Sequence, residues 1–297
     1  MGPAALVRPI SFVRGLALRI KSRLDGPRIV RVPDPAPSAT WRTGLQLDLS
    51  GRVALVTGAS GELGRSIART LSACGASVAV HYFRGADKAE VVRRELEDLG
   101  APSCTVQADV CSEASVYAMR DQISQRLGPV EIVVHNAIEW YPDAHIQTQS
   151  LEAFDRMYRS SVHQIILCAK AFVPGMIERQ RGRIIGISSE VAIQALPGKA
   201  AYTAAKRSMD GVLRTLAHEV GFHQITVNQI APGWMISDRD RRDGTQEAPH
   251  YSVRVPLARR GYDQDVAHAV AFLASDLAMF ITGAYLPVCG GNVMPGI

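Results

Sequence analysis

The sequence predicts an α/β fold in which helices cover both faces of a parallel sheet of about seven strands. Short runs of β-branched and apolar residues alternate along the chain with longer segments of helical periodicity. The short runs are apolar on both faces, which is typical of strands buried between two layers of helices. The 297 residues contain no internal repeat, and single α/β domains often reach about 250 residues. We therefore expect one doubly wound domain.

The predicted elements follow one another regularly from residue 47 to residue 297. The first strand, VALVT, is a continuous apolar run, and the later strands resemble it in length and composition. The predicted strands cover residues 53–57, 77–81, 103–107, 130–135, 183–188, 225–230 and 284–288. The segments between them have the length and apolar spacing of helices. The predicted helices cover residues 62–74, 86–99, 113–127, 151–178, 200–221 and 263–275.

Residues 1–46 form an N-terminal extension of different composition. The first 50 residues carry eight Arg or Lys and three Asp, whereas residues 51–297 carry 25 basic and 25 acidic residues. Residues 6–24 mix apolar and basic side chains without an acid, and four prolines in residues 25–43 are typical of a linker. The extension is either poorly ordered, or a basic amphipathic helix that contacts a membrane surface or a partner, or an organelle transit peptide. The neutral body gives no reason to expect nucleic-acid binding.

Cysteine usage and hydropathy predict a cytoplasmic protein. The five cysteines are scattered and form no CxxC pair, which favours free thiols in a reducing compartment and no metal site. No run of about 18 uncharged apolar residues occurs, so we expect no integral membrane span. Organelle targeting through the basic N-terminal segment is the alternative location.

The first predicted strand ends in a glycine-rich turn, TGASGELG at residues 57–64, and a predicted helix follows. Glycines at such a turn let the backbone approach a pyrophosphate, and the start of the helix supplies free N–H donors. The position of the glycines between a strand and a helix is the context that indicates a dinucleotide site.

This turn resembles the TGxxxGxG fingerprint of the short-chain dehydrogenase/reductase family, which has a Rossmann-like fold. The resemblance implies that a cofactor contacts Gly58, Ser60, Glu62, Leu63 and Gly64. Glu62 stands where the middle glycine is usual, and a carboxylate beside a pyrophosphate is unfavourable unless it points away or has a cationic partner. Arg65 and Arg84 are the expected partners.

The second predicted strand indicates the cofactor. NAD sites usually place an acid about 20 residues past the glycines to bind the ribose 2′-OH. Here the strand and its end read VAVHYFR, without an acid. The Tyr82 and Arg84 positions are similar to those of NADPH-preferring members of the family, and Arg84 can pair with a 2′-phosphate. We therefore expect NADP(H).

The resemblance implies further cofactor contacts along the chain. They follow the third to sixth strands and comprise Asp109, Val110, Asn136, Ala137, Ile187, Pro232, Gly233, Met235 and Ser237. His135 and Ile138 depart from the NNAG run that the family commonly has after its fourth strand. Ile138 is expected to narrow the site beside the ribose.

Tyr202 and Lys206 form a Tyr-x-x-x-Lys pair, which places both side chains on one face of a helix. A nearby ammonium favours the phenolate, so we expect Lys206 to lower the pKa of Tyr202 and let it give a proton to a carbonyl oxygen near neutral pH. By resemblance, Lys206 also binds the nicotinamide ribose, and Ser189 is the residue that orients the substrate oxygen. Ser161 stands where the family has a catalytic asparagine that helps to hold a proton-relaying water.

The substrate side of the site is less readable. Trp140 follows the fourth strand and is expected to wall the pocket, together with Trp234 from the loop after the sixth strand. Glu190 is placed to approach a cationic or amine-bearing substrate. Residues 237–256 stand where the family has a mobile substrate lid, and they are crowded with charge.

Together these motifs cover residues 49–293 and are similar to the 3-oxoacyl-carrier-protein reductase-like and pteridine reductase-like members of the family. They predict an NADPH-dependent reductase that transfers hydride to a ketone of a small molecule. Reduction of a C=N bond, as in pterins, and a non-catalytic NADP(H)-binding protein of the same fold are the alternatives. The resemblance also implies a homo-dimer or homo-tetramer built through the helices near 151–178 and 200–221.

Overall fold

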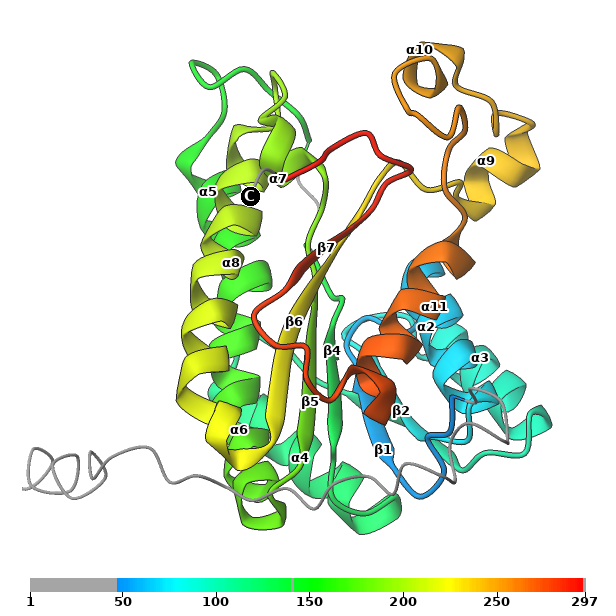
Figure 1. The fold of residues 1–297 in the computed structure, drawn as a ribbon, viewed down its shortest axis with the longest axis vertical. Helices are drawn as coiled ribbons and strands as arrows, with labels where there is room; N and C mark the ends of the chain where they lie inside the picture. The colour runs from blue at the N-terminus through cyan, green and yellow to red at the C-terminus, as the bar shows by residue number, and fades with distance from the viewer. Residues whose placement is uncertain (1–46, 140–141, 296–297) are drawn as a thin grey trace, which may run out of the picture. The chain divides into compact units, whose positions relative to one another are not determined.

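The structure is a computed structural model that describes residues 47–139 and 142–295. Its centre is one parallel sheet with the strand order β3-β2-β1-β4-β5-β6-β7 (Figure 1). The strands are β1(Val53–Val56), β2(Ser77–Tyr82), β3(Ser103–Gln107), β4(Ile132–His135), β5(Gly182–Ile187), β6(Ile225–Pro232) and β7(Tyr285–Val288). The predicted fold class is therefore confirmed.

Two layers of helices cover the sheet because successive strand residues point to opposite faces. Ala54 and Val56 of β1 pack into one apolar cluster, whereas Leu55 between them packs into the other. The first cluster is covered by α2(Glu62–Ala73), α3(Ala86–Asp98) and α11(Asp263–Ala274). The second is covered by α4(Glu113–Arg126), α6(Gln164–Arg179) and α8(Ala200–Val220). Burial on both faces explains why the strands lack polar alternation.

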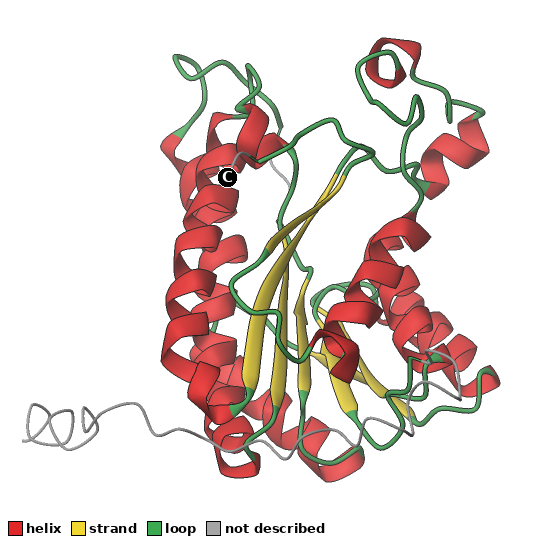
Figure 2. Cartoon of the chain, viewed as in Figure 1, coloured by secondary structure: helices red, strands yellow, loops and turns green. Residues whose placement is uncertain are grey.

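The predicted helix over 151–178 is divided in the structure. It consists of α5(Leu151–Tyr158), a π turn η1(Arg159–His163) and α6, and Pro174 lies inside α6. The apolar spacing continues through the π turn, so periodicity did not reveal the break. Residues 237–256, called the lid region below, contain two short helices, α9(Asp238–Asp243) and α10(Pro249–Ser252), which Figure 2 shows above the sheet. A further short helix, α7(Val191–Gln194), follows β5.

The segment Leu151–Arg179 is long and apolar enough to cross a membrane by length and composition alone. Just over half of its most apolar stretch is buried inside the fold. The buried side chains of α6 include Ile165, Cys168 and Phe172, which belong to the core beneath the sheet. The central helix of a globular domain has these same properties, so the segment is weak evidence for a membrane span.

The position of β1 between β2 and β4 determines where a ligand can enter. From β1 the chain proceeds to β2 and β3 on one side, and from β4 to β7 on the other. The turns that leave β1 and β4 therefore diverge at the carboxyl ends of the strands, and they leave a crevice there. This is the usual ligand position in a doubly wound sheet.

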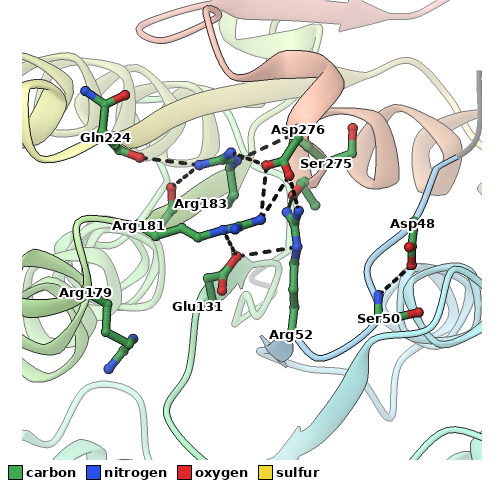
Figure 3. A network of polar contacts seen from close by, with 12 residues as sticks. Asp48, Ser50, Arg52, Glu131, Arg179, Arg181, Arg183, Gln224, Ser275 and Asp276 are labelled. Carbon is green, nitrogen blue, oxygen red and sulfur yellow. Dashed lines mark hydrogen bonds and ion pairs between the residues drawn. The ribbon is translucent and has the colours of Figure 1, made fainter. Parts of the chain in front are cut away.

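At the amino ends of the strands, opposite the crevice, five charged side chains form an ion-pair network (Figure 3). Asp276 accepts hydrogen bonds from Arg52 at 2.6 Å, from Arg181 at 3.0 Å and from Arg183 at 3.0 Å. Glu131 accepts from Arg181 at 2.8 Å. Arg52 and Arg183 are buried, so their guanidinium charges depend on these carboxylates. The network ties the starts of β1 and β5 to the segment after α11.

We expect Asp276→Ala to lower the free energy of unfolding by about 1–3 kcal/mol, because it leaves two buried guanidinium groups without this carboxylate. Urea denaturation followed by circular dichroism measures the change. Asp121→Ala is the control, since Asp121 is exposed and pairs with its exposed neighbour Arg120. Equal stability of the two variants would contradict a structural role for the network.

Candidate active site

The crevice at the carboxyl ends of the strands holds a cavity of about 660 Å³. Its walls come from the turn after β1, the ends of β2 and β3, the loop after β4, the start of the π turn, the end of β5, helix α8 and the loop after β6. Most of the predicted site residues meet in this wall: Gly58, Ser60, Glu62, Leu63, Gly64, Arg84, Asp109, Val110, Asn136, Ala137, Ile187, Ser189, Tyr202, Lys206, Pro232, Gly233 and Met235.

The glycine-rich turn has no room for side chains at two positions. Gly58 has a φ of +65°, and a Cβ there would lie 3.0 Å from the Cα of Ala137. A Cβ on Gly64 would lie 2.3 Å from the carbonyl oxygen of Gly58. These glycines therefore let the start of α2 approach β1 and the loop after β4 closely. The same close approach exposes the backbone of the turn to the cavity.

Thr57 and Asn136 hold the turn against the end of β4. The Thr57 hydroxyl accepts hydrogen bonds from the N–H groups of Asn136 and Ala137, both at 2.9 Å. The side-chain amide of Asn136 donates to the Thr57 carbonyl at 2.9 Å. Asn136 therefore contributes to the site by fixing the shape of the glycine-rich turn, in addition to lining the cavity.

His81 supports the turn from below, and sequence analysis did not assign it to the site. The N–H of Gly58 donates to Nδ1 of His81 at 2.9 Å, and Nε2 lies 3.1 Å from the carbonyl oxygen of Ala108. Nδ1 must be unprotonated to accept, so the ring is neutral and Nε2 donates. Burial of the ring lowers the pKa of His81 to about 4. The neutral imidazole thus links the ends of β1, β2 and β3.

The expected partners of Glu62 are wrong. Arg65 donates to Glu95 on α3 through Nε at 2.9 Å and through a second, shorter contact. The Glu62 carboxylate instead accepts a hydrogen bond from the N–H of Asp238, the first residue of α9, at 3.1 Å. It is exposed, and its contact crosses from the glycine-rich turn to the lid region. The guanidinium of Arg65 is directed to α3 by its ion pair with Glu95 and does not contact Glu62.

At the end of β2, strand alternation separates the two residues predicted to select the cofactor. Arg84 lines the cavity and stacks on Phe83, with its Cζ 5.2 Å from the ring centroid. Tyr82 instead packs against the apolar cluster beneath α2 and α3. His81 and Phe83 line the cavity on either side of Tyr82, because neighbours in a strand point to opposite faces. Tyr82 is therefore placed away from the cavity.

Ser189, Tyr202 and Lys206 lie together at the inner end of the cavity. The Ser189 hydroxyl is hydrogen-bonded to Tyr202. The Lys206 ammonium donates to the carbonyl oxygen of Ile187 at 2.7 Å and lies 5.9 Å from the centroid of the Tyr202 ring. The end of β5 and one face of α8 thus bring the side chains of Ser189, Tyr202 and Lys206 to one place.

The expected effect of Lys206 on Tyr202 needs correction. Burial raises the pKa of Tyr202 above its usual value, and the hydrogen bond from Ser189 only partly offsets this. Burial also lowers the pKa of Lys206 to about 8. The ammonium loses its hydration and the phenol is also desolvated, so burial outweighs the attraction between the two groups. The phenol of Tyr202 therefore carries its proton near neutral pH, as an unperturbed tyrosine also does.

Ser161, in the asparagine position, lies behind the cavity wall. Its hydroxyl is buried and, within residues 47–139 and 142–295, has no hydrogen-bond partner. Ser161 and its neighbour Ser160 both belong to the π turn, and Ser160 is the one that lines the cavity. Gln164 occupies the space beside them and donates to the carbonyl oxygens of Ala137, at 2.6 Å, and Ser160. A catalytic role of Ser161 stays a prediction.

Two residues predicted to lie near the substrate have other contacts. Glu190 is buried and accepts hydrogen bonds from Tyr251 of α10 and from Asn292, each at 3.0 Å. Burial raises the pKa of its carboxyl group. Trp234 lies under the guanidinium of Arg260, whose Cζ is 4.3 Å from the ring centroid. Both residues therefore stabilise the lid region and lie outside the cavity wall.

Ser237 caps the N-terminus of α9 and does not line the cavity. Its hydroxyl donates to the Asp240 carboxylate at 2.7 Å and accepts from the Asp240 N–H at 3.0 Å. This reciprocal capping explains why a short, charged segment forms a helix.

Trp140 lies outside the described residues. Ile138, which was expected to narrow the site, lines the cavity. The cavity wall also contains residues that sequence analysis did not assign to the site: Gly61, His81, Phe83, Cys111, Glu139, Ser160 and Ser188. Each of these residues lies within two positions of a residue that the sequence assigned to the site, and this proximity along the chain was the available signal.

The neutral state of His81 predicts an acid-sensitive fold. Its pKa is about 4 in the folded protein and 6.5 in the unfolded chain, so the unfolded chain binds more protons between these values. We expect the free energy of unfolding to fall as pH decreases from 6.5 to 4, with His81 contributing about 3 kcal/mol. Urea denaturation across this range measures the slope. His81→Asn keeps a donor and an acceptor without titrating, and an unchanged slope in this variant would contradict the assignment.

Comparison with known proteins agrees with this geometry. Residues 58–292 match the family model described as enoyl-(acyl carrier protein) reductase. The 3-oxoacyl-[acyl-carrier-protein] reductase FabG of Pseudomonas aeruginosa is 37% identical over 248 residues, which cover 84% of this chain and 100% of the relative. The FabG protein of Staphylococcus aureus is 36% identical over 241 residues, covering 81% of this chain and 98% of the relative.

A solved structure with the same fold is a 7α-hydroxysteroid dehydrogenase complexed with NADH and 7-oxo glycochenodeoxycholic acid. It has a TM-score of 0.76 and 31% identity, and the match covers 84% of this chain and 96% of that one. The glycine-rich turn, the Ser–Tyr–Lys group and these matches along most of the chain lead to one conclusion. The protein belongs to the short-chain dehydrogenase/reductase family of oxidoreductases.

Proposed function

We propose that this protein is an NADPH-dependent reductase that transfers hydride to a ketone of a small-molecule substrate. The observation that carries the proposal is the meeting of Ser189, Tyr202 and Lys206 in the same cavity as the glycine-rich turn. A proton donor, a hydroxyl that can hold an oxygen and a buried cation then face the position of a bound dinucleotide. The Ser–Tyr hydrogen bond places the two groups close enough to contact one carbonyl oxygen.

The cavity fits a nicotinamide dinucleotide. The crowding at Gly58 and Gly64 leaves backbone as the surface of the turn, as close approach to a pyrophosphate requires. Asp109, Val110 and Lys206 line the same cavity. In this proposal Asp109 and Val110 contact the adenine, and Lys206 contacts the nicotinamide ribose. Arg84 extends the adenosine end and supplies a planar cation for a 2′-phosphate. The cofactor, when bound, supplies the hydride.

The protein residues then handle the proton and the oxygen. Tyr202 gives its phenolic proton to the substrate oxygen as charge develops there, and the group is protonated beforehand, as a phenol is near neutral pH. The Ser189 hydroxyl orients that oxygen and donates a hydrogen bond to it. Lys206, anchored on the Ile187 carbonyl, places a cation beside Tyr202 and stabilises the phenolate that remains after transfer.

The choice of ketone chemistry and of NADPH has different support. The names of the FabG relatives specify 3-oxoacyl substrates, and the hydroxysteroid dehydrogenase structure contains a 7-oxo steroid. Ser189 supplies a neutral hydroxyl that can hold a carbonyl oxygen, which supports the reduction of a ketone. A second solved structure, a blue fluorescent protein from a metagenomic library with a TM-score of 0.76 and 32% identity over 83% of this chain, contains NADPH. Since the steroid dehydrogenase contains NADH, the preference for NADPH rests on Arg84.

We also propose a homo-dimer or homo-tetramer and a cytoplasmic location. Helices α6 and α8 together form a shallow groove of about 370 Å³, lined by apolar residues that include Ile166, Ala169 and Val212. Ile166 is exposed in the single chain, so a second copy would cover it. Residues 1–46 lie outside the described residues, and membrane contact by residues 6–24 stays a prediction.

We expect Tyr202→Phe to lower ketone reduction by about 10²–10⁴-fold, because it removes the general acid. NADPH binding should persist, since the phenol contributes little to holding the dinucleotide. Turnover of an acetoacetyl thioester, a cyclic imine and a dihydropterin measures the activity, and nicotinamide fluorescence measures binding. Tyr158→Phe, on the exposed face of α5, is the control. Binding of NADPH by the wild type without turnover of any substrate would favour the non-catalytic alternative.

The preference for NADPH should depend on Arg84. Arg84→Ala removes a charge-assisted contact to the 2′-phosphate, so we expect NADPH affinity to fall by about 10–100-fold. NADH affinity should change less than twofold, because NADH lacks that phosphate. Fluorescence titrations with both cofactors give the two dissociation constants. Arg94→Ala, at an exposed position of α3, controls for lost surface charge, and an equal loss for NADH and NADPH would rule out the 2′-phosphate assignment.

A further inference from the structure

Glu62 has a contact that a glycine in its place would lack. Its carboxylate oxygen Oε2 accepts the hydrogen bond of the Asp238 N–H at 3.1 Å, between residues 176 positions apart. We propose that Glu62 is a positioning residue that holds α9 over the phosphate-binding end of the cavity and thereby slows release of the dinucleotide. The inference rests on the dinucleotide binding proposed above.

The contact joins two opposite walls of the cavity. Gly61, Glu62 and Leu63 form part of one wall, whereas Gly233 and Met235 form part of the other. Asp238 follows Met235 by three residues, and three residues span at most about 10 Å. The hydrogen bond therefore closes a bridge near the edge of the cavity, on the side of the glycine-rich turn. A pyrophosphate bound at that turn would lie beside the bridge, and its departure would require the bridge to move.

Helix α9 is held firmly enough to serve as one end of this bridge. Arg260, whose side chain is 1% exposed, donates to the Asp240 carboxylate at 2.7 Å and to the Met235 carbonyl at 2.8 Å. Arg241 pairs with Asp263 of α11 at 2.7 Å. The helix is thus fastened to the domain on its far side, and Glu62 fastens it on the side of the cavity.

The charge of Glu62 opposes its hydrogen bond. Within residues 47–139 and 142–295 the carboxylate forms no ion pair, because Arg65 and Arg69 both pair with Glu95 instead. The negative charge then repels an incoming pyrophosphate, whereas the bond to Asp238 retains a dinucleotide already bound. The charge weakens association and the bridge slows dissociation, so substitutions that separate the two effects should change different rate constants.

Two variants separate them. Glu62→Gln keeps an oxygen that can accept from Asp238 but removes the charge, whereas Glu62→Ala removes both. Glu113→Ala is the matched control, because Glu113 is the first residue of α4 as Glu62 is of α2, and it lies outside the cavity wall. Stopped-flow fluorescence of NADPH release and association gives the two rate constants. Hydrogen exchange of the peptide that contains Asp238, in protein without cofactor, reports the bridge itself.

We expect NADPH release from Glu62→Ala to be about three- to tenfold faster than from the wild type, the effect of one lost hydrogen bond. Exchange at Asp238 should also be faster. Glu62→Gln should release NADPH at the wild-type rate and bind it faster, and Glu113→Ala should resemble the wild type in all three measurements.

Two results would overturn the inference while leaving the proposed function intact. One is unchanged release from Glu62→Ala together with tight NADPH binding. The other is equal acceleration of release in Glu62→Gln and Glu62→Ala, which would show that a hydrogen-bond acceptor at this position does not by itself retain the dinucleotide. Failure of the wild type to bind either dinucleotide would instead refute the proposed function, and the control of release with it.

Discussion

The site depends on the hydroxyl group of Thr57, which holds the ends of two adjacent strands together. It accepts from the N–H groups that follow β4 and lies 3.1 Å from the side-chain oxygen of Gln164 at the start of α6. Because Thr57 has no exposed surface, water does not compete for these bonds. The glycine-rich turn leaves β1 directly after Thr57, so its position relative to Asn136 and to the π turn is set at this one residue. The cavity inherits its shape from that arrangement.

Burial then determines the charge state of the groups around the cavity. His81 is neutral because burial disfavours its cationic form, and neutrality lets it accept from Gly58. The same effect lowers the pKa of Lys206 and raises that of Tyr202. In the proposed reaction the phenol of Tyr202 is protonated beforehand, as an unperturbed tyrosine already is near neutral pH. In the same proposal, Lys206 is held in position by the Ile187 carbonyl and stabilises the phenolate that forms during transfer.

The lid is joined to the reactive end of the cavity by buried polar contacts. Tyr251 donates to Glu190 at 3.0 Å and accepts from the N–H of Trp234 at 2.9 Å, so α10, the loop after β6 and the residue next to Ser189 are connected. At the opposite end of the cavity, Glu62 connects α9 to the glycine-rich turn. Both connections use carboxylates whose roles were expected to be toward ligands. They make the lid part of the domain on both sides of the cavity.

The amino-acid sequence by itself determined the fold class, the succession of seven strands along the chain and most of the residues that line the cavity. Strand composition, the glycine-rich turn and the Ser–Tyr–Lys spacing are local signals, and local signals survive without tertiary information. The tertiary structure alone decided the partner of Glu62 and the pKa direction of Tyr202. It also placed His81 beside the cavity and Tyr82 against the apolar cluster on the other face of the sheet. The division of the helix around Ser161 was also invisible in the sequence. Hydrogen bonds between residues 176 positions apart, and burial by elements from across the sheet, depend on contacts that no local pattern records.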